Sequence, residues 1–116
     1  IMADRELLSR VLDNLIDNAI RYTQPGGHID ITVDANDQTL TIGVGDDGEG
    51  IPLDEQTRIF DKFAQGSTSY TRLAHQGAGL GLAFCRLAVE AHGGTITASG
   101  KPGQGAMFTI TLPIAP

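Results

Sequence analysis

One stretch decides the fold: DRELLSRVLDNLIDNAIRY, residues 4–22. Its apolar residues recur at the three- and four-residue spacing of an amphipathic helix, with Asp4 in place to cap the amino end. The apolar positions are Leu7, Leu8, Val11, Leu12, Leu15, Ile16 and Ala19. The run Gln24-Pro-Gly-Gly27 then ends the helix, because proline and glycine are strong helix breakers. We therefore predict a helix over residues 4–22 with one apolar face to bury.

Two pairs of strands follow this helix. Apolar residues alternate over residues 28–33 and again over 39–44, which predicts a hairpin with one buried face. Residues 95–99 and 107–112 predict a second hairpin in the same way.

Between the hairpins the sequence predicts two helices and a long loop. A short helix is expected over residues 54–63 and a second main helix over 80–92, which Gly93-Gly94 ends. Residues 64–78 have weak periodicity, and a loop of that length in a compact domain is usually functional or disordered. Because helices and antiparallel strands are segregated, the fold class is α+β: a two-layer α/β sandwich with helices packed on one face of a mixed, mainly antiparallel sheet.

The composition fits one domain, residues 1–116, and narrows its partners. With 41% hydrophobic residues the chain can bury a core, and its 19% charged residues argue against disorder. The net charge of −6 comes without a basic patch, so no nucleic-acid binding is expected. No stretch approaches the ~20 apolar residues that span a bilayer. Cys85 is the only cysteine, which excludes an internal disulfide and fits a reducing compartment; we expect it to be a small core residue.

Polar side chains line one edge of the apolar face of the first helix. At 100° per residue, Asn14 and Asn18 lie about 40° apart, one turn from each other. Buried amides need partners, and two interpretations stay open: hydrogen bonds to neighbouring backbone, or amide oxygens that hold Mg²⁺, a cation that takes oxygen ligands. Arg21, one turn further on, can reach a phosphate or form a surface ion pair with Asp17.

A second motif, Asp46-Asp-Gly-Glu-Gly-Ile-Pro52, forms a tight loop directly after a predicted strand. Its glycines, Gly48 and Gly50, permit close approach of the backbone. A carboxylate beside bare backbone can accept a hydrogen bond from an amino group on a planar ligand such as adenine. A simple Asx-type turn explains the same residues equally well.

A third motif, Gly77-Ala-Gly-Leu-Gly-Leu82, begins the second main helix. Glycines free backbone N–H groups, and the amino end of a helix favours anions, so this run can meet phosphates. A flexible hinge is the alternative. The spacing differs from the dinucleotide fingerprint and from the phosphate-binding loop that ends in Lys-Ser or Lys-Thr.

Taken in order, the motifs resemble the catalytic, ATP-binding domain of bacterial sensor histidine kinases. The wider group includes gyrase, the large heat-shock chaperone and the mismatch-repair ATPases. Residues 11–23, 46–52, 59–63 and 77–82 resemble the family's N, G1, F and G2 boxes, and His92-Gly-Gly, Gly105-Ala-Met-Phe and Leu112-Pro match its tail. The resemblance implies a Bergerat-type ATP-binding fold.

The resemblance also implies ATP and Mg²⁺ as cofactors and assigns residues to them. Asn18, with Asn14, would hold the metal, and Asp46 would bond the adenine amino group. Residues 64–76 would form a lid over the nucleotide. The remaining nucleotide contacts would be Arg21, Tyr22, Gly48, Gly50, Ile51, Arg72, Gly77, Gly79, Leu80, Gly81 and Leu82.

The chain departs from the family pattern in three ways. Gln65 stands where many relatives carry a lid arginine, so we transfer the lid cation to Arg72. The position after Asp46 is often Asn and here is Asp47. The family domain usually begins with a strand before the first helix, and we expect that strand upstream because we interpret this chain as a fragment of a longer one.

Asn14 also favours phosphoryl transfer over rapid ATP hydrolysis. The gyrase-like branch has at this position a Glu that activates water, whereas an amide cannot act as a general base. The family's acceptor histidine lies on a separate helical domain, and none of His28, His75 and His92 has its helical His-Glu or His-Asp context.

The resemblance implies partners for this domain. It would act on the dimerisation or histidine phosphotransfer domain of its parent protein, and a response regulator would follow. The isolated domain is expected to be a cytoplasmic monomer without direct membrane contact, although the parent can be membrane-anchored. The alternatives are a nucleotide-binding sensor module without kinase activity, a gyrase- or chaperone-like ATPase, and an anti-sigma-factor serine kinase.

Overall fold

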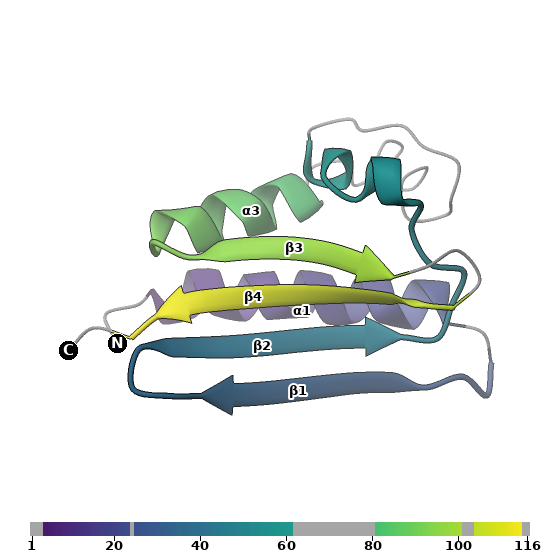
Figure 1. Ribbon diagram of the computed structural model, residues 1–116, viewed down its shortest axis with the longest axis horizontal. Helices are drawn as coiled ribbons and strands as arrows, with labels where there is room; N and C mark the ends of the chain where they lie inside the picture. Colours follow the sequence, from purple (N-terminus) through teal and green to yellow (C-terminus); the bar gives the residue numbers. More distant parts are fainter. Residues whose placement is uncertain (1–3, 24, 62–80, 101–103, 115–116) are drawn as a thin grey trace.

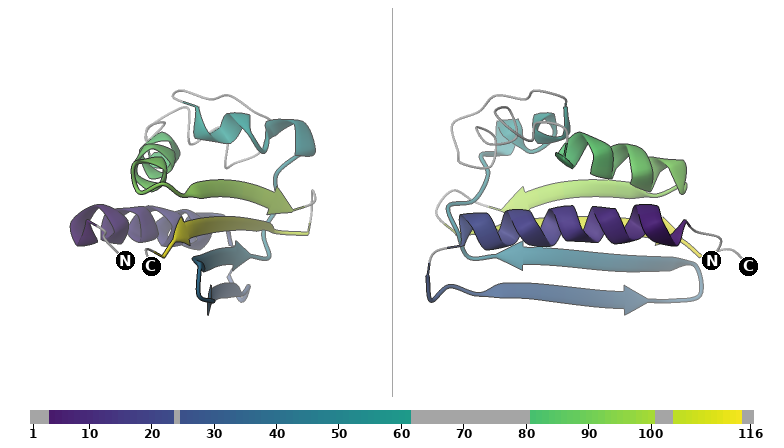
Figure 2. Two further views of the ribbon diagram at one scale, coloured as in Figure 1. Left: turned by 60° about the vertical axis from the view of Figure 1, so that its left-hand side comes forward. Right: turned by 180° about the vertical axis from the view of Figure 1, so that it is seen from behind.

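The computed structural model describes residues 4–23, 25–61, 81–100 and 104–114. Helices and a four-stranded sheet form two layers, with both long helices on one face of the sheet (Figures 1 and 2). The elements are α1 (Arg5–Tyr22), β1 (Ile29–Ala35), β2 (Thr39–Asp46), η1 (Leu53–Glu55), η2 (Arg58–Phe60), α3 (Gly81–Ala91), β3 (Thr95–Gly100) and β4 (Ala106–Pro113). The sheet order is β1-β2-β4-β3 and every pair is antiparallel. The predicted two-layer α+β sandwich is confirmed.

Side-chain hydrogen bonds mark both ends of helix α1. The Asp4 side chain accepts a hydrogen bond from the backbone N–H of Leu7 at 3.0 Å, which confirms the predicted N-cap. At the other end Thr23 is extended, and its hydroxyl donates to the carbonyl of Ala19 at 2.6 Å. The apolar stripe of α1 between these ends faces the core, with Val11 and Leu15 fully buried.

The core lies between the two helices and the central strands. Phe108 of β4 and Phe60 of η2 meet edge to face, with ring centroids 6.1 Å apart. Cys85 is fully buried among them, as predicted. Among the described residues, no helix has the length and apolar character needed to cross a membrane. The largest fully buried side chains are Phe108, Leu15, Ile51, Ile59, Ile110, Leu112, Val11, Val44, Val89 and Cys85.

The prediction of a buried apolar face was wrong for β1. Its alternation is as expected, but Ile31 is 54% exposed and Val33 is 68% exposed. β1 is an edge strand, and α1 lies over its neighbours instead, as both views in Figure 2 show. The side chains that face the helices from β2, such as Val44, are the ones that become buried. The alternation in the sequence predicted which residues share a face of the strand, but not whether the helices cover that face.

The short helix predicted over residues 54–63 is also corrected. Two 3-10 turns, η1 and η2, replace it in the described residues, which stop at Asp61. Their hydrogen bonds span three residues: Glu55 N–H to the Pro52 carbonyl at 2.9 Å and Asp61 N–H to the Arg58 carbonyl at 2.9 Å. A segment this short cannot repay the cost of nucleating an α-helix, so it settles into tight single turns.

The strands run slightly longer than the alternation predicted. β2 extends to Asp46, because Asp46 pairs with Ile29 of β1 on one side and with Ala106 of β4 on the other. Asp46 is therefore the last residue of a central strand rather than the first residue after it. At the end of α3, Gly93 adopts a positive φ of 77° and the chain turns into β3, as the Gly93-Gly94 signal predicted.

Candidate functional site

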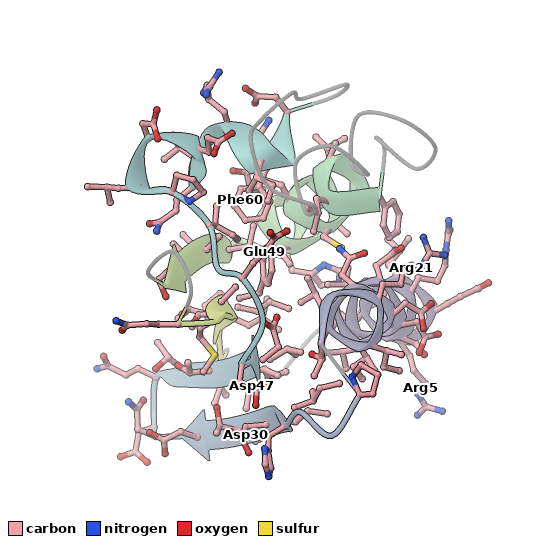
Figure 3. The ribbon with its side chains drawn as sticks, turned by 90° about the vertical axis from the view of Figure 1, so that its right-hand side faces the viewer. Arg5, Arg21, Asp30, Asp47, Glu49 and Phe60 are labelled. Atoms are coloured by element: carbon pink, nitrogen blue, oxygen red, sulfur yellow. The ribbon has the colours of Figure 1, made fainter. Side chains whose placement is uncertain are left out.

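The predicted site residues that the structure describes come from elements that meet at one end of the molecule. The carboxyl ends of α1 and β2 and the amino end of α3 all lie there (Figure 1). Figure 3 looks onto this end and shows Arg21 of α1 on one side and Asp47 and Glu49 of the loop after β2 on the other. Segments far apart in the sequence thus lie close to one another at this end of the molecule.

Asn14 of α1 is oriented toward the start of α3. Its side-chain Nδ2 donates to the carbonyl of Arg10 at 3.0 Å, which leaves Oδ1 on the other side of the amide. A Cβ built on Gly81 would lie 3.4 Å from that oxygen, so the two groups are neighbours. Of the two interpretations of Asn14, the backbone hydrogen bond is real. That bond occupies the nitrogen and presents the oxygen to the site.

The donor set on α1 fits a hard cation such as Mg²⁺. Asn18 is half-buried one turn beyond Asn14, on the same edge of the helix. Amide oxygens are ligands that Mg²⁺ accepts, and the ion usually completes its shell with water and phosphate oxygens. In the described part of the chain, no group of three or more His, Cys, Asp or Glu side chains offers an alternative metal site.

Arg21 projects from the last turn of α1 as an exposed side chain. The alternative interpretation, an ion pair with Asp17, is not realised: within the described residues, the ion pairs are His28–Asp47 and Arg86–Asp61. The guanidinium at the end of α1 is thus not occupied by that neighbour.

Asp46 ends β2 in the row of side chains that faces the helices. Strand alternation places it on the same face as Ile42 and Val44. Its Oδ1 accepts a hydrogen bond from the backbone N–H of Gly48 at 2.9 Å, so the Asx-type turn is present. That turn holds the carboxylate on the helix side of the sheet. The two interpretations of Asp46 are compatible, since the turn fixes the group that would meet a base.

The rest of the loop is shaped by glycine and by burial. Gly50 has φ of 80°, a conformation that favours glycine. Ile51, the next residue, is fully buried. The loop therefore leaves the sheet at Asp46 and returns into the core at Ile51.

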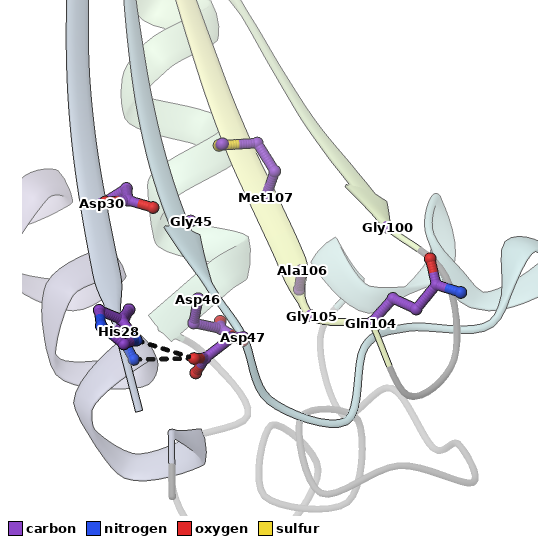
Figure 4. Close-up of a pocket in the computed structure, with 10 residues that line it drawn as sticks. All are labelled: His28, Asp30, Gly45, Asp46, Asp47, Gly100, Gln104, Gly105, Ala106 and Met107. Carbon is purple, nitrogen blue, oxygen red and sulfur yellow. Dashed lines mark hydrogen bonds and ion pairs between the residues drawn. The ribbon is translucent and has the colours of Figure 1, made fainter. Parts of the chain in front are cut away.

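The Asp47 side chain binds His28, which is not one of the predicted nucleotide contacts. Its Oδ2 accepts from the backbone N–H of His28 at 2.9 Å and lies 3.4 Å from the ring Nδ1 of the same residue. Figure 4 shows this pair at the rim of an open pocket of about 230 Å³. Of the predicted nucleotide contacts that the structure describes, Asp46 alone lines that pocket. The Asp47 departure from the family pattern thus ties the loop to the segment before β1.

Two residues that support the loop, Gln56 and Gly105, were not among the predicted site residues. The Gln56 side-chain Nε2 donates to the carbonyl of Ile51 at 3.1 Å and to that of Gly100 at 3.0 Å. Gly105 packs so closely under Asp46 that any Cβ there would clash with the Asp46 carbonyl oxygen. Gly105 stood in the tail motif, but Gln56 carried no sequence signal.

Contacts between α1 and α3 hold the two sides of the site in register. The Cys85 thiol donates to the carbonyl of Val11 at 3.7 Å, and the Arg10 guanidinium lies 4.5 Å from the centre of the Phe84 ring. Burial raises the pKa of the Cys85 thiol from 9.0 to about 12, outweighing the opposite effect of a hydrogen bond with the backbone of Cys85 itself. Leu82, predicted as a nucleotide contact, is 3% exposed and belongs to the core at the start of α3.

Several predicted residues lie outside the described residues. These are Arg72, Gly77, Gly79 and Leu80, together with the predicted lid over residues 64–76. The Tyr22 side chain is likewise not described, although its backbone belongs to α1.

Comparisons with known proteins agree with the motif order. The family described as histidine kinase-, DNA gyrase B- and HSP90-like ATPase matches residues 3–116. The sensor protein KdpD of Escherichia coli (strain K12) is 44% identical over 113 residues, which are 97% of this chain and 12% of KdpD. The adaptive-response sensory kinase SasA of Parasynechococcus marenigrum (strain WH8102) is 44% identical over 116 residues, covering 98% of this chain and 30% of SasA. The chain spans less than a third of either relative.

Solved structures give the same answer for the fold. The mycobacterial sensor histidine kinase MprB superposes with a TM-score of 0.82 at 28% identity, over 97% of this chain and 74% of that chain. Full-length ShkA, in complex with AMPPNP, superposes with a TM-score of 0.83 at 34% identity, over 99% of this chain and 23% of ShkA.

The chain belongs to the histidine kinase-, DNA gyrase B- and HSP90-like ATPase family. Its relatives are sensor histidine kinases, and its fold is that of their catalytic domains. It is therefore an ATP-binding domain of the histidine kinase type.

Proposed function

We propose that this domain binds Mg²⁺-ATP and donates the γ-phosphoryl group to a histidine on a separate dimerisation domain of its parent protein. The observation that carries the proposal is Asn14: its amide nitrogen is held by the Arg10 carbonyl and its oxygen faces the start of α3. An amide in this place can hold a metal or a phosphate but cannot activate water. The AMPPNP bound to the similar protein ShkA supports a nucleotide site in this fold.

The residues of this chain would divide the work of holding ATP. Asp46 accepts a hydrogen bond from the adenine amino group, while Ile51 and the loop glycines form the wall beside the base. Asn14 and Asn18 hold the metal, which screens phosphate charge when it is bound. Arg21 and, in the lid, Arg72 contribute positive charge near the phosphates.

Phosphoryl transfer suits a site built in this way. The reaction forms a bond between phosphorus and an imidazole nitrogen and breaks the bond from phosphorus to the oxygen of the leaving ADP. It depends mainly on positioning and charge stabilisation. With an amide at Asn14 in place of a general base, the domain therefore holds ATP intact until a better nucleophile arrives.

The proposed partners and location rest on the relatives. A cytoplasmic domain would present ATP to the phosphoacceptor domain, and a response regulator would then take the phosphoryl group. The relatives named as sensor proteins and sensory kinases support this assignment.

The test combines this domain with the dimerisation helices of its own parent protein and labelled ATP. We expect an acid-labile, alkali-stable phosphohistidine on the helices, and very slow ATP hydrolysis by the domain alone. Rapid turnover by the isolated domain would instead favour an ATPase of the gyrase or chaperone kind. ATP binding without any phosphohistidine would leave a nucleotide-sensing module.

A further inference from the structure

We infer that Gln56 is a positioning residue for base recognition: it ties the loop of residues 46–51 to the end of β3, and so fixes the direction of the Asp46 carboxylate. The inference rests on the proposed function, because it assumes that Asp46 meets adenine. It adds a residue that lies outside the predicted nucleotide contacts.

The side-chain amide of Gln56 uses both of its hydrogens. Nε2 donates to the Ile51 carbonyl at 3.1 Å and to the Gly100 carbonyl at 3.0 Å, and these two acceptors lie 49 residues apart in the chain. The side chain is half-buried between the turns η1 and η2. Because both partners are carbonyl oxygens, only a donor can stand here. A carboxylate of the same shape would face two acceptors without a hydrogen to share.

The start of the loop, at Asp46, packs against Gly105, the residue that precedes β4. A Cβ on Gly105 would clash with the carbonyl oxygen of Asp46 and would lie 3.0 Å from the Cα of Asp47. Gly100 and Gly105 themselves pack closely, since a Cβ on Gly100 would clash with the Gly105 carbonyl oxygen. β3 and β4 therefore support the loop at its start, through Gly105, and at its end, through Gln56.

The loop is held at both of its ends. Gly105 packs beneath Asp46, the Ile51 side chain is buried in the core, and the Gln56 hydrogen bond orients the Ile51 carbonyl, so loss of that bond would let the backbone between Gly48 and Ile51 rotate. The backbone N–H of Gly48 holds Asp46 Oδ1 at 2.9 Å, so movement of that segment would turn the carboxylate. Adenine recognition requires this group at a fixed angle, because a hydrogen bond weakens steeply when it is misaligned.

The inference can be tested by comparing two nucleotides that differ in the group at position 6 of the base. ATP carries an amino group there, which can donate to Asp46. Inosine triphosphate carries an oxygen, which cannot. The ratio of the two affinities therefore reports the geometry of Asp46 and is insensitive to losses that affect both nucleotides alike.

The test measures ATP and inosine triphosphate binding by calorimetry for the whole domain and for Gln56→Met and Gln56→Glu. Gln56→Met keeps the volume and loses both donors; Gln56→Glu places an acceptor against the two carbonyls. We expect the preference for ATP to fall about tenfold in Gln56→Met and further in Gln56→Glu. Gln38→Met and Gln38→Glu, at an exposed position in the turn between β1 and β2, are the matched controls and should keep the preference.

Thermal unfolding of each variant distinguishes positioning from simple support. A lower melting temperature with an unchanged ATP preference would make Gln56 merely structural and overturn the inference. A wild-type domain that binds both nucleotides equally would overturn the assignment of Asp46, and the inference with it.

Discussion

At the scale of single residues, Asp46 is the most direct test of the nucleotide site. Asp46→Asn keeps the size of the side chain and removes the acceptor charge. We expect ATP affinity to fall by roughly ten- to a hundredfold, the equivalent of about 1.5–3 kcal/mol for a charged hydrogen bond. Calorimetric titration with ATP measures the change, and Asp47→Asn is the control, since Asp47 binds His28 instead. Equal affinities for wild type and Asp46→Asn would refute the assignment.

Asn18 tests the metal site in the same way. Asn18→Ala removes one amide oxygen from the edge of α1, so Mg²⁺ should no longer raise ATP affinity, while metal-free binding of the base changes little. The measurement is ATP affinity with Mg²⁺ and with excess chelator. If Mg²⁺ still enhances binding to the same extent, another ligand holds the metal.

The buried thiol of Cys85 should make the free energy of unfolding depend on pH in the alkaline range. Burial raises the pKa of its thiol from 9.0 to about 12, so the thiol ionises in the unfolded chain at lower pH than in the folded one. Its contribution to stability is complete below pH 9 and is lost as the pH rises toward 12. Urea unfolding across this range should show a steeper decline for wild type than for Cys85→Ala. Parallel declines would show that the thiol ionises equally in both states.

The candidate site could be predicted from the sequence as a set of residues but not as a set of contacts. Asn14 and Asp46 stood out because their side-chain chemistry sits at fixed places on a helix and at a strand end. The Gln56 bridge could not be found, because its acceptors lie in the loop after β2 and at the end of β3, which only tertiary packing brings together. The His28–Asp47 pair was hidden for the same reason. Long-range contacts of this kind leave no local pattern.

At the scale of elements, two glycines with positive φ allow the cost of backbone strain to be measured apart from the cost of a steric clash. Gly26 and Gly105 have φ of 85° and 89°, so Ala at either position pays a similar conformational cost of about 1–2 kcal/mol. A Cβ on Gly26 meets open space, whereas one on Gly105 clashes with the Asp46 carbonyl oxygen. We expect Gly105→Ala to lose at least about 1 kcal/mol more stability than Gly26→Ala in urea unfolding. It should also weaken ATP binding, because the loop must shift.

The longer elements were predictable because their periodicity spans several turns. Helix α1 starts within a residue of the predicted position, at a cap the sequence showed directly. The prediction of a helix after Pro52 was wrong. The apolar residues of that segment fit a helix, but the segment is short and forms isolated 3-10 turns. Local pattern decides an element only where the element is long enough to be cooperative.

At the scale of the whole molecule, the two layers do not cover each other completely. The helices bury one face of β2, β3 and β4, and leave Ile31 and Val33 of β1 in contact with solvent. Sequence alternation could not show this, since it gives the two faces of a strand but not the width of the helical layer above it.

Matched substitutions on neighbouring strands measure that difference. Val33 is 68% exposed, whereas Val44 of β2 is 1% exposed, and both face the helical layer. Val33→Thr should change the free energy of unfolding by less than about 0.5 kcal/mol. Val44→Thr buries a hydroxyl in the core and should cost about 1–3 kcal/mol. Urea unfolding of the two variants checks both values, and similar costs would mean that β1 is covered in solution.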